Sequence, residues 1–178
     1  LNPGCRFFDI RIGQSVTLTG RCITQHMASK VNEVVTGKYD HKGESIVYGD
    51  TDSVYFSAFK TLEKEIKEGV IPWTKDSVVA LYDKIADEVN GSFKSFMTRA
   101  FHTPSTRGEV IAAGRELVAS KGLFITKKRY AVLYYYKEGK RADVDGKDGK
   151  MKAMGLDLKR SDTPVFVQDF LSEILYMV

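Results

Sequence analysis

Two aspartates, Asp50 and Asp52, lie in the stretch IVYGDTDSVYF between two runs of β-branched and aromatic residues. Such runs favour strands, so the stretch predicts a hairpin over residues 46–56 with both aspartates at its tip. Residues i and i+2 of an extended segment point to the same side, which would present the two carboxylates together. Magnesium prefers oxygen ligands of this kind and is commonly held by one or two carboxylates together with substrate phosphates. The spacing alone leaves open a plain turn in which both side chains accept backbone hydrogen bonds.

A basic run, Lys127, Lys128 and Arg129, followed by Tyr130, is the second group with a chemical role to test. Clustered cationic side chains bind backbone phosphates without reading bases. A short basic run is also typical of a solvated turn before a strand, and the run by itself does not decide between the two. The three histidines are too scattered along the chain to predict a metal site.

Helical spacing of apolar residues predicts two long helices on either side of the aspartate hairpin. The first runs from about Gly13 to Val35 and is expected to bury one face, formed by Val16, Ile23, Met27, Val31 and Val34. The second follows Thr74, a residue type that caps helix N-termini, and its apolar face is formed by Val78, Leu81, Tyr82, Ile85 and Val89.

After the second helix, the sequence predicts strands and one further helix. Residues 123–156 are rich in aromatic and β-branched side chains and predict two or three antiparallel strands. Thr163 as cap and Pro164 as first residue predict a short C-terminal helix. The order helix, hairpin, helix, strands, helix predicts an α+β fold with helices packed on one face of an antiparallel sheet. A doubly wound parallel sheet is disfavoured, because strands and helices do not alternate regularly.

The composition fits a soluble globular protein with one sizeable core, since 43% of its 178 residues are hydrophobic. The net charge of +4 allows contact with a polyanion without requiring it. No apolar run approaches the length needed to cross a bilayer, so no membrane contact and a cytoplasmic location are predicted. Cys5 and Cys22 lack CxxC spacing, which predicts free thiols in a reducing compartment. Because it starts LNPGCRFFDI, without an initiator Met, the chain is expected to be a piece of a longer protein.

The stretch YGDTDS, Tyr48 to Ser53, resembles the signature on the catalytic palm hairpin of family B DNA polymerases. Downstream, KKRY resembles the primer-template motif of the same family, and two motifs in the right order are more specific than either alone. Three further segments are similar to polymerases of T-even-like phages: the helix after the fingers motif at 5–27, the segment around KKRY at 115–132, and the palm-to-thumb junction at 154–164. The resemblance implies a palm over residues 1–155 and the start of a helical thumb over residues 156–178.

The resemblance also implies a role for each candidate residue. Asp52 would bridge two Mg²⁺ ions, and Asp50 would be a more distant supporting carboxylate. Glu116 is expected to contribute a further carboxylate through water, with Glu109 as the competing residue. The four residues of KKRY would contact primer-template DNA.

The implied function is DNA-templated DNA polymerisation, in which deoxynucleoside triphosphates extend a primer 3′-OH and release pyrophosphate. The family's first catalytic carboxylate, its nucleotide-binding motif and its exonuclease carboxylates are absent from the sequence. An upstream polymerase segment is therefore an expected partner, and the isolated chain is expected to be inactive. Two alternatives stay open: a DNA-binding segment without a catalytic role, and a nucleotide cyclase with a palm-like metal hairpin.

Overall fold

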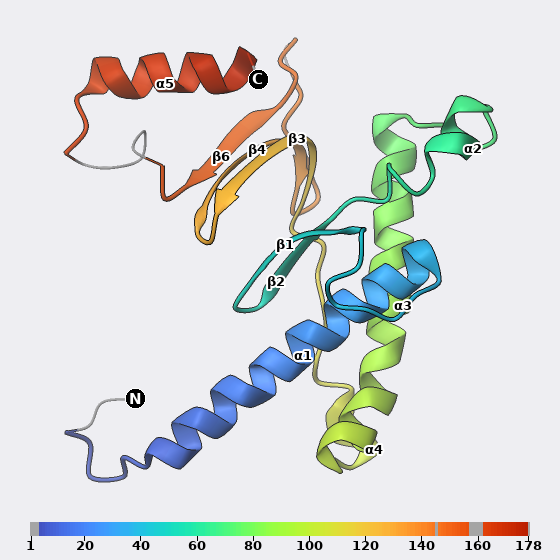
Figure 1. The fold of residues 1–178 in the computed structure, drawn as a ribbon, viewed down its shortest axis with the longest axis vertical. Helices are drawn as coiled ribbons and strands as arrows, with labels where there is room; N and C mark the ends of the chain where they lie inside the picture. Colours follow the sequence, from blue (N-terminus) through green and yellow to red (C-terminus); the bar gives the residue numbers. More distant parts are fainter. Residues whose placement is uncertain (1–3, 145, 157–161, 178) are drawn as a thin grey trace. The chain divides into compact units, whose positions relative to one another are not determined.

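The computed structural model describes residues 4–144, 146–156 and 162–177, which form two compact units divided between residues 113 and 114 (Figure 1). The first unit contains α1 (Ile10–Thr36), β1 (Ile46–Asp50), β2 (Ser53–Phe56), α2 (Glu63–Lys67), α3 (Lys75–Phe101) and α4 (Ser105–Gly108). The second contains β3 (Leu117–Thr126), β4 (Arg129–Lys137), β5 (Lys140–Arg141), β6 (Lys150–Met154) and α5 (Val165–Met177). The predicted α+β class with antiparallel strands is confirmed, although the described strands form two sheets rather than one.

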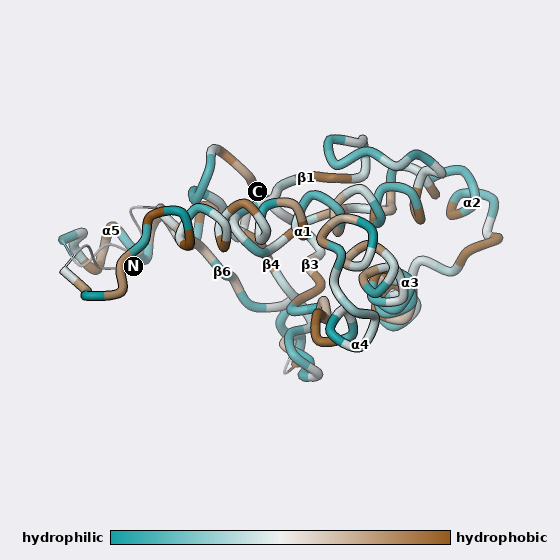
Figure 2. The backbone as a smooth tube through the Cα atoms, turned by 90° about the horizontal axis from the view of Figure 1, so that it is seen from below, coloured by the Kyte–Doolittle hydropathy of each residue, from teal (hydrophilic) through white to brown (hydrophobic). Residues whose placement is uncertain are grey.

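The first predicted helix is confirmed as α1. Asp9 caps its N-terminus by accepting a hydrogen bond from the Arg11 N–H at 2.8 Å, and Gly37 ends it in the left-handed conformation with φ 78°. Apolar and polar stretches alternate along the helix (Figure 2). Val16 is nevertheless 68% exposed, so the predicted buried face is wrong at its N-terminal end. The reason is that the core of the unit packs against the C-terminal part of α1, from Ile23 onward.

The core of the first unit lies between α1 and α3 and is formed by Val31, Ile85, Val89 and Phe93. Val89 and Phe93 are only 1% and 2% exposed. Burial of an apolar side chain of this size stabilises a fold by about 1.5–3 kcal/mol. The second predicted helix is confirmed as α3, which begins after Thr74 with a capping box. These two helices form the support on which the hairpin is built.

β1 and β2 form the predicted hairpin, in which Ile46 pairs with Phe56 at the open end and Asp50 pairs with Ser53 at the tip. Ile46 and Phe56 pack against the core between α1 and α3. The ring of Phe56 also lies edge-on to Tyr82 of α3, with ring centroids 5.2 Å apart. The apolar end of the hairpin is therefore anchored in the core, and the polar end carries the aspartates.

The second unit is an antiparallel sheet in which β4 is central. β3 pairs with one edge of β4, whereas β5 and β6 pair with different parts of its other edge. The turn from β4 to β5 uses Glu138 and Gly139, with φ 47° and 81°, as a two-residue hairpin requires. Leu171 and Leu175 of α5 pack on Ala131 of β4, so the predicted C-terminal helix is confirmed and covers part of the sheet. The predicted boundary between residues 155 and 156 stays a prediction, and residues 157–161 next to it lie outside the described part.

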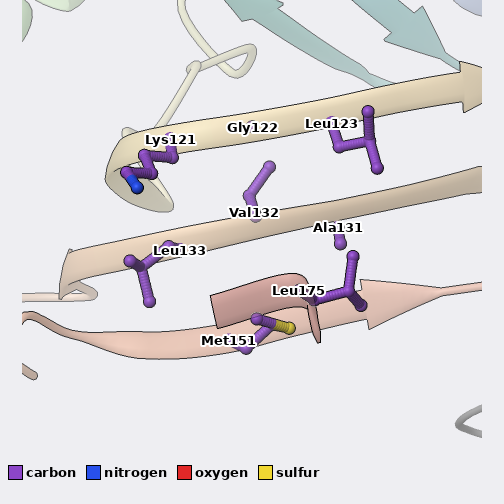
Figure 3. Close-up of a pocket in the computed structure, with 8 residues that line it drawn as sticks. All are labelled: Lys121, Gly122, Leu123, Ala131, Val132, Leu133, Met151 and Leu175. Carbon is purple, nitrogen blue, oxygen red and sulfur yellow. The ribbon is translucent and has the colours of Figure 1, made fainter. Parts of the chain in front are cut away.

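A small hollow lies on this sheet beside α5, and Figure 3 shows the side chains that line it. They come from β3, β4, β6 and α5 and are Lys121, Gly122, Leu123, Ala131, Val132, Leu133, Met151 and Leu175. Lys121 is the one charged residue in this lining, and no carboxylate belongs to it. The hollow therefore contains none of the residues predicted to act in catalysis.

None of the helices in the described residues has a stretch that is both long and apolar enough to pass through a bilayer.

Candidate functional site

The two aspartates lie at the tip of the β1–β2 hairpin. Asp50 ends β1, and Thr51 and Asp52 are the two residues between the strands. The Ser53 hydroxyl donates to the Asp50 carbonyl at 3.2 Å, and the Thr51 hydroxyl donates to the Asp50 carboxylate at 3.3 Å. Asp50 is half-buried, whereas Asp52 is exposed. Both carboxylates are thus within two residues of each other at one end of the hairpin, and Asp52 is open to solvent.

The turn has an uncommon backbone conformation. Thr51 has φ 43°, a left-handed value that is rare for a β-branched residue. Such a conformation costs on the order of 1–3 kcal/mol and persists only where surrounding contacts hold it. One such contact comes from α1, where the Thr24 hydroxyl donates to the Thr51 carbonyl at 2.9 Å. The tip is therefore attached to the helix as well as to its own strands.

The loop between α1 and β1 is held by a buried amide. Asn32 of α1 is 1% exposed, and its side-chain nitrogen donates to the Lys38 carbonyl at 2.8 Å. Gly43 lies directly against the Asn32 carboxamide, where a Cβ would overlap it. The loop thus approaches the helix closely because Gly43 has no side chain, and this approach leads the chain into β1.

His26 connects α1 to α3. The ring is 6% exposed, stacks on Phe96 with centroids 3.9 Å apart, and places Nδ1 at 2.7 Å from the Tyr39 hydroxyl and Nε2 at 2.9 Å from the Ser92 hydroxyl. The Ser92 hydroxyl also donates to the Val89 carbonyl at 2.6 Å, so it accepts from the histidine. Nε2 therefore carries the proton of the neutral ring, and Nδ1 accepts from Tyr39. His26 is thus a buried side chain with a hydrogen-bond partner on each ring nitrogen.

The donor set at the hairpin tip fits magnesium. Asp50 and Asp52 offer hard carboxylate oxygens, and magnesium is often bound by no more than one or two protein carboxylates. Across residues 4–144, 146–156 and 162–177, no three His, Cys, Asp or Glu side chains lie close enough together to hold a metal ion. The fit therefore rests on two carboxylates, which is within the ordinary range for this ion.

The two candidates for a third carboxylate lie in different units, and each forms an ion pair. Glu116, just before β3, accepts from Lys152 of β6 at 2.7 Å and lies 3.9 Å from the Lys137 ammonium of β4. Glu109 pairs with Lys94 of α3 in the first unit. These contacts place Glu116 among the cationic side chains of the sheet. The choice between Glu116 and Glu109 as a further ligand stays a prediction.

The KKRY residues form the turn between β3 and β4 and the start of β4. Lys127 and Lys128 are the two residues of the turn, and Lys128 has φ 63°. Both lysines and Arg129 are exposed. Residues 1–113 carry equal numbers of basic and acidic side chains, so the whole surplus of +4 belongs to the unit that contains this turn. This surplus is compatible with contact to a polyanion, and the predicted DNA contact of the turn stays a prediction.

Tyr130 and Gly155 support the basic turn from within the sheet. The Tyr130 ring is 5% exposed and stacks on Phe124 of β3, with centroids 5.6 Å apart. Gly155, just after β6, accepts a hydrogen bond on its carbonyl from Arg129 Nε at 3.1 Å. A Cβ at Gly155 would overlap the Lys128 carbonyl, so the backbone passes close beneath the turn. This burial gives Tyr130 a supporting position, and its predicted contact with duplex DNA stays a prediction.

Known proteins similar to this chain are DNA polymerases. The chain is 34% identical over 186 residues to the DNA-directed DNA polymerase of Escherichia phage RB69, in an alignment that covers 98% of the chain and 20% of that polymerase. It is 29% identical over 180 residues to the polymerase of Enterobacteria phage T4, covering 94% of the chain and 19% of the relative. It is also 28% identical over 171 residues to the DNA polymerase delta catalytic subunit of Oryza sativa subsp. japonica, covering 95% and 12%.

The resemblance to polymerases of T-even-like phages is thereby confirmed. The chain spans about a fifth of the length of these phage relatives. No family model and no solved structure matches the chain.

Proposed function

We propose that this chain is the part of a phage-like replicative DNA polymerase that carries the catalytic hairpin. The reaction is template-directed addition of deoxynucleotides to a primer 3′-OH, with release of pyrophosphate. The observation that supports it best is the hairpin itself: Asp50 and Asp52 share a tip that is fixed to a helix, in a chain similar to polymerases along nearly its whole length. In this proposal residues 1–155 belong to the palm, and the thumb starts at residue 156.

The hairpin holds the two carboxylates for magnesium. Asp52, exposed at the tip, is the residue proposed to hold both ions, and Asp50, half-buried at the end of β1, supports it. Magnesium held there would neutralise charge on the nucleotide phosphates, help to activate the attacking oxygen and stabilise negative charge on the leaving oxygen. The strands end on either side of the turn, and the Thr24 contact from α1 restrains the turn that carries Asp52. Such prior positioning lowers the barrier of a phosphoryl transfer. Glu116, or alternatively Glu109, is proposed as a further carboxylate.

The basic turn is proposed to hold the duplex. Lys127, Lys128 and Arg129 are exposed, and their positive charges can bind DNA backbone phosphates. These phosphates are the same whatever the base sequence of the DNA. A polymerase must copy any template, so contact with the backbone is the recognition that it needs. The partners are primer-template DNA, deoxynucleoside triphosphates and an upstream polymerase segment that supplies the remaining catalytic groups. The short share of each relative that the chain covers supports the last of these.

A second function, DNA binding without catalysis, is favoured by one observation. Lys127, Lys128 and Arg129 are exposed, and they can bind backbone phosphates without any contribution from the aspartates. A nucleotide cyclase has no comparable support, because the relatives found are named as DNA polymerases. Primer extension separates the proposed function from the second one.

The test uses the complete polymerase that contains this chain. Asp52→Asn removes one negative charge at nearly constant shape, and we expect it to lower the rate of single-nucleotide addition by roughly a hundredfold or more, while primer-template affinity changes little. Asp50→Asn should lower the rate less. Asp87→Asn, the same change at an exposed position of α3, is the matched control and should leave the rate unaltered. Extension by Asp52→Asn at the parental rate would leave only the DNA-binding function.

A further inference from the structure

The Thr24 hydroxyl in α1 faces two acceptors. It lies 3.0 Å from the Gly20 carbonyl, one turn earlier in the same helix, and 2.9 Å from the Thr51 carbonyl at the hairpin tip. Threonine commonly makes the first of these contacts in helices. The second contact is made across 27 residues of sequence, and it attaches the helix to the turn between the two aspartates.

The acceptor belongs to the peptide bond that joins Thr51 to Asp52. A peptide unit is planar, so a hydrogen bond to its oxygen also restrains the orientation of the amide nitrogen of Asp52. That orientation, together with the φ of Asp52, sets the direction in which its Cβ leaves the backbone. Thr24 thus restrains the carboxylate that the proposed mechanism uses most, without touching it.

The turn needs such a restraint. Thr51 is β-branched and has φ 43°, so the isolated turn would relax toward a less strained conformation. Ladder hydrogen bonds fix Asp50 and Ser53 on either side, but Thr51 and Asp52 lie outside the ladder. The contact from α1 acts on just this part of the hairpin.

The part of α1 that makes this contact is itself held in place by hydrogen bonds and core packing. His26, two residues beyond Thr24, is 6% exposed and is bound to the hydroxyls of Tyr39 and Ser92. Met27 and Ile23, the neighbours on the apolar side, pack against the core of the unit. The backbone of α1 at position 24 is therefore held in place by its neighbours, so the side chain there can restrain the turn.

We propose that Thr24 is a positioning residue for catalysis: its hydroxyl holds the Thr51–Asp52 peptide in the orientation that directs the Asp52 carboxylate toward the magnesium ions. This role rests on the proposed polymerase function. It predicts that loss of the hydroxyl at position 24, rather than a change in the shape of the side chain, alters the magnesium dependence of nucleotide addition.

Two substitutions at position 24 and one elsewhere in α1 separate the hydroxyl from the helix. Thr24→Val keeps the shape and removes the donor, and Thr24→Ser keeps the donor. Thr17→Val is the matched control, because the Thr17 hydroxyl bonds to the carbonyl one turn earlier, that of Gly13, at 2.9 Å. All three are made in the complete polymerase, together with Asp52→Asn.

Two readouts are measured. The first is the rate of single-nucleotide addition across a magnesium series, where we expect Thr24→Val to lower the maximal rate by roughly tenfold or more and to raise the magnesium concentration at half-maximal rate. The second is amide hydrogen exchange in residues 46–56 without magnesium, where Thr24→Val should speed exchange by about tenfold. Thr24→Ser and Thr17→Val should stay close to the parent in both.

Three results would overturn the proposal. The first is a Thr24→Val enzyme with parental magnesium dependence and parental exchange, while Asp52→Asn is inactive. The second is an equal loss in Thr17→Val, which would trace the effect to the helix rather than to the turn. The third is an active Asp52→Asn enzyme, which would remove the proposed function and this role together.

Discussion

The side-chain oxygen of Asn32 accepts two hydrogen bonds from Ser45, one from its backbone N–H at 3.2 Å and one from its hydroxyl at 2.7 Å. Both residues are 1% exposed. The Ser45 carbonyl in turn accepts from the Ser57 N–H at 2.8 Å, just beyond the end of β2. A single buried amide in α1 thus holds the open end of the hairpin, where the chain enters β1 and leaves β2.

Asn32→Ala should therefore lower the free energy of unfolding by about 2–4 kcal/mol. The substitution leaves the buried N–H and hydroxyl of Ser45 without the partner that the amide provides, and each such buried group costs about 1–3 kcal/mol. Ser45→Ala is the graded control, because it removes the hydroxyl and keeps the backbone bond, and it should cost about 1 kcal/mol. Urea unfolding of parent and variants measures both. Equal stability of Asn32→Ala and the parent would contradict a structural role for the amide.

The stability of the folded chain should depend on pH partly through the titration of His26. Burial lowers the pKa of this imidazole below its ordinary value of 6.5, and the nearby cations Lys30 and Arg99 lower it further, while Glu33 acts in the opposite direction. Well above pH 6.5 the ring is neutral in both the folded and the unfolded chain, and its contribution to stability is complete. As the pH falls below 6.5, the unfolded chain takes up a proton that the folded chain resists, so stability falls, by at most about 1.4 kcal/mol per pH unit from this group.

The measurement is the thermal midpoint of the parent and of His26→Gln between pH 8 and pH 5. Glutamine still offers a donor and an acceptor but does not titrate, so the difference between the two profiles isolates the histidine. We expect the two curves to converge as the pH falls. Parallel curves over the whole range would mean that the ring does not resist protonation in the folded chain.

The sequence predicted the parts of the fold that depend on strong local patterns. The helix after Thr74 was predictable because a capping residue precedes apolar residues at helical spacing, and these residues are buried or partly buried. The hairpin tip was predictable because turn residues separate two β-rich runs. In contrast, β3 begins at Leu117, six residues before the predicted strand region, and its first part contains Ala119, Ser120 and Lys121, which have weak strand preference. Pairing with β4 makes them a strand, and that pairing is not a local property.

The support of the candidate site was not predictable in the same way. Thr24 and Asn32 are ordinary polar residues of a helix when read in sequence, and His26 looked isolated. Their partners lie 27, 13 and 66 residues away, at Thr51, Ser45 and Ser92. A signal for them exists in the pattern, since Asn32 and His26 fall on or beside the apolar face of the predicted helix, and buried polar side chains need partners.

Gly155 should be required for the shape of the basic turn. It has φ 64°, and an added Cβ would overlap the Lys128 carbonyl, so Gly155→Ala must shift the turn. Gly139, with φ 81° and open space around it, is the matched control for backbone strain alone. We expect Gly139→Ala to cost about 1 kcal/mol and Gly155→Ala to cost clearly more, with weaker primer-template binding only in the second. Denaturant unfolding and a binding titration measure the two effects, and equal costs would argue against a close approach at Gly155.

The basic turn itself gives a prediction about salt. If Lys128 and Arg129 contact backbone phosphates, each contact releases condensed counterions when DNA binds. Replacing both residues with Ala in the complete polymerase should weaken primer-template binding and reduce the slope of log affinity against log salt by roughly one unit per lost contact. Because phosphates carry no sequence, the loss should be the same for unrelated templates.

A matched double variant separates this local effect from net charge. Lys64→Ala with Lys84→Ala removes the same charge from two exposed positions of the first unit, and it should leave the salt slope nearly unchanged. The assay is binding to several unrelated primer-templates across a salt series, with both double variants beside the parent. A loss that depended on template sequence would indicate contact with bases. An unchanged slope and affinity in the Lys128 and Arg129 variant would mean that the turn is a solvated surface feature, and the DNA-contact role of KKRY would be wrong.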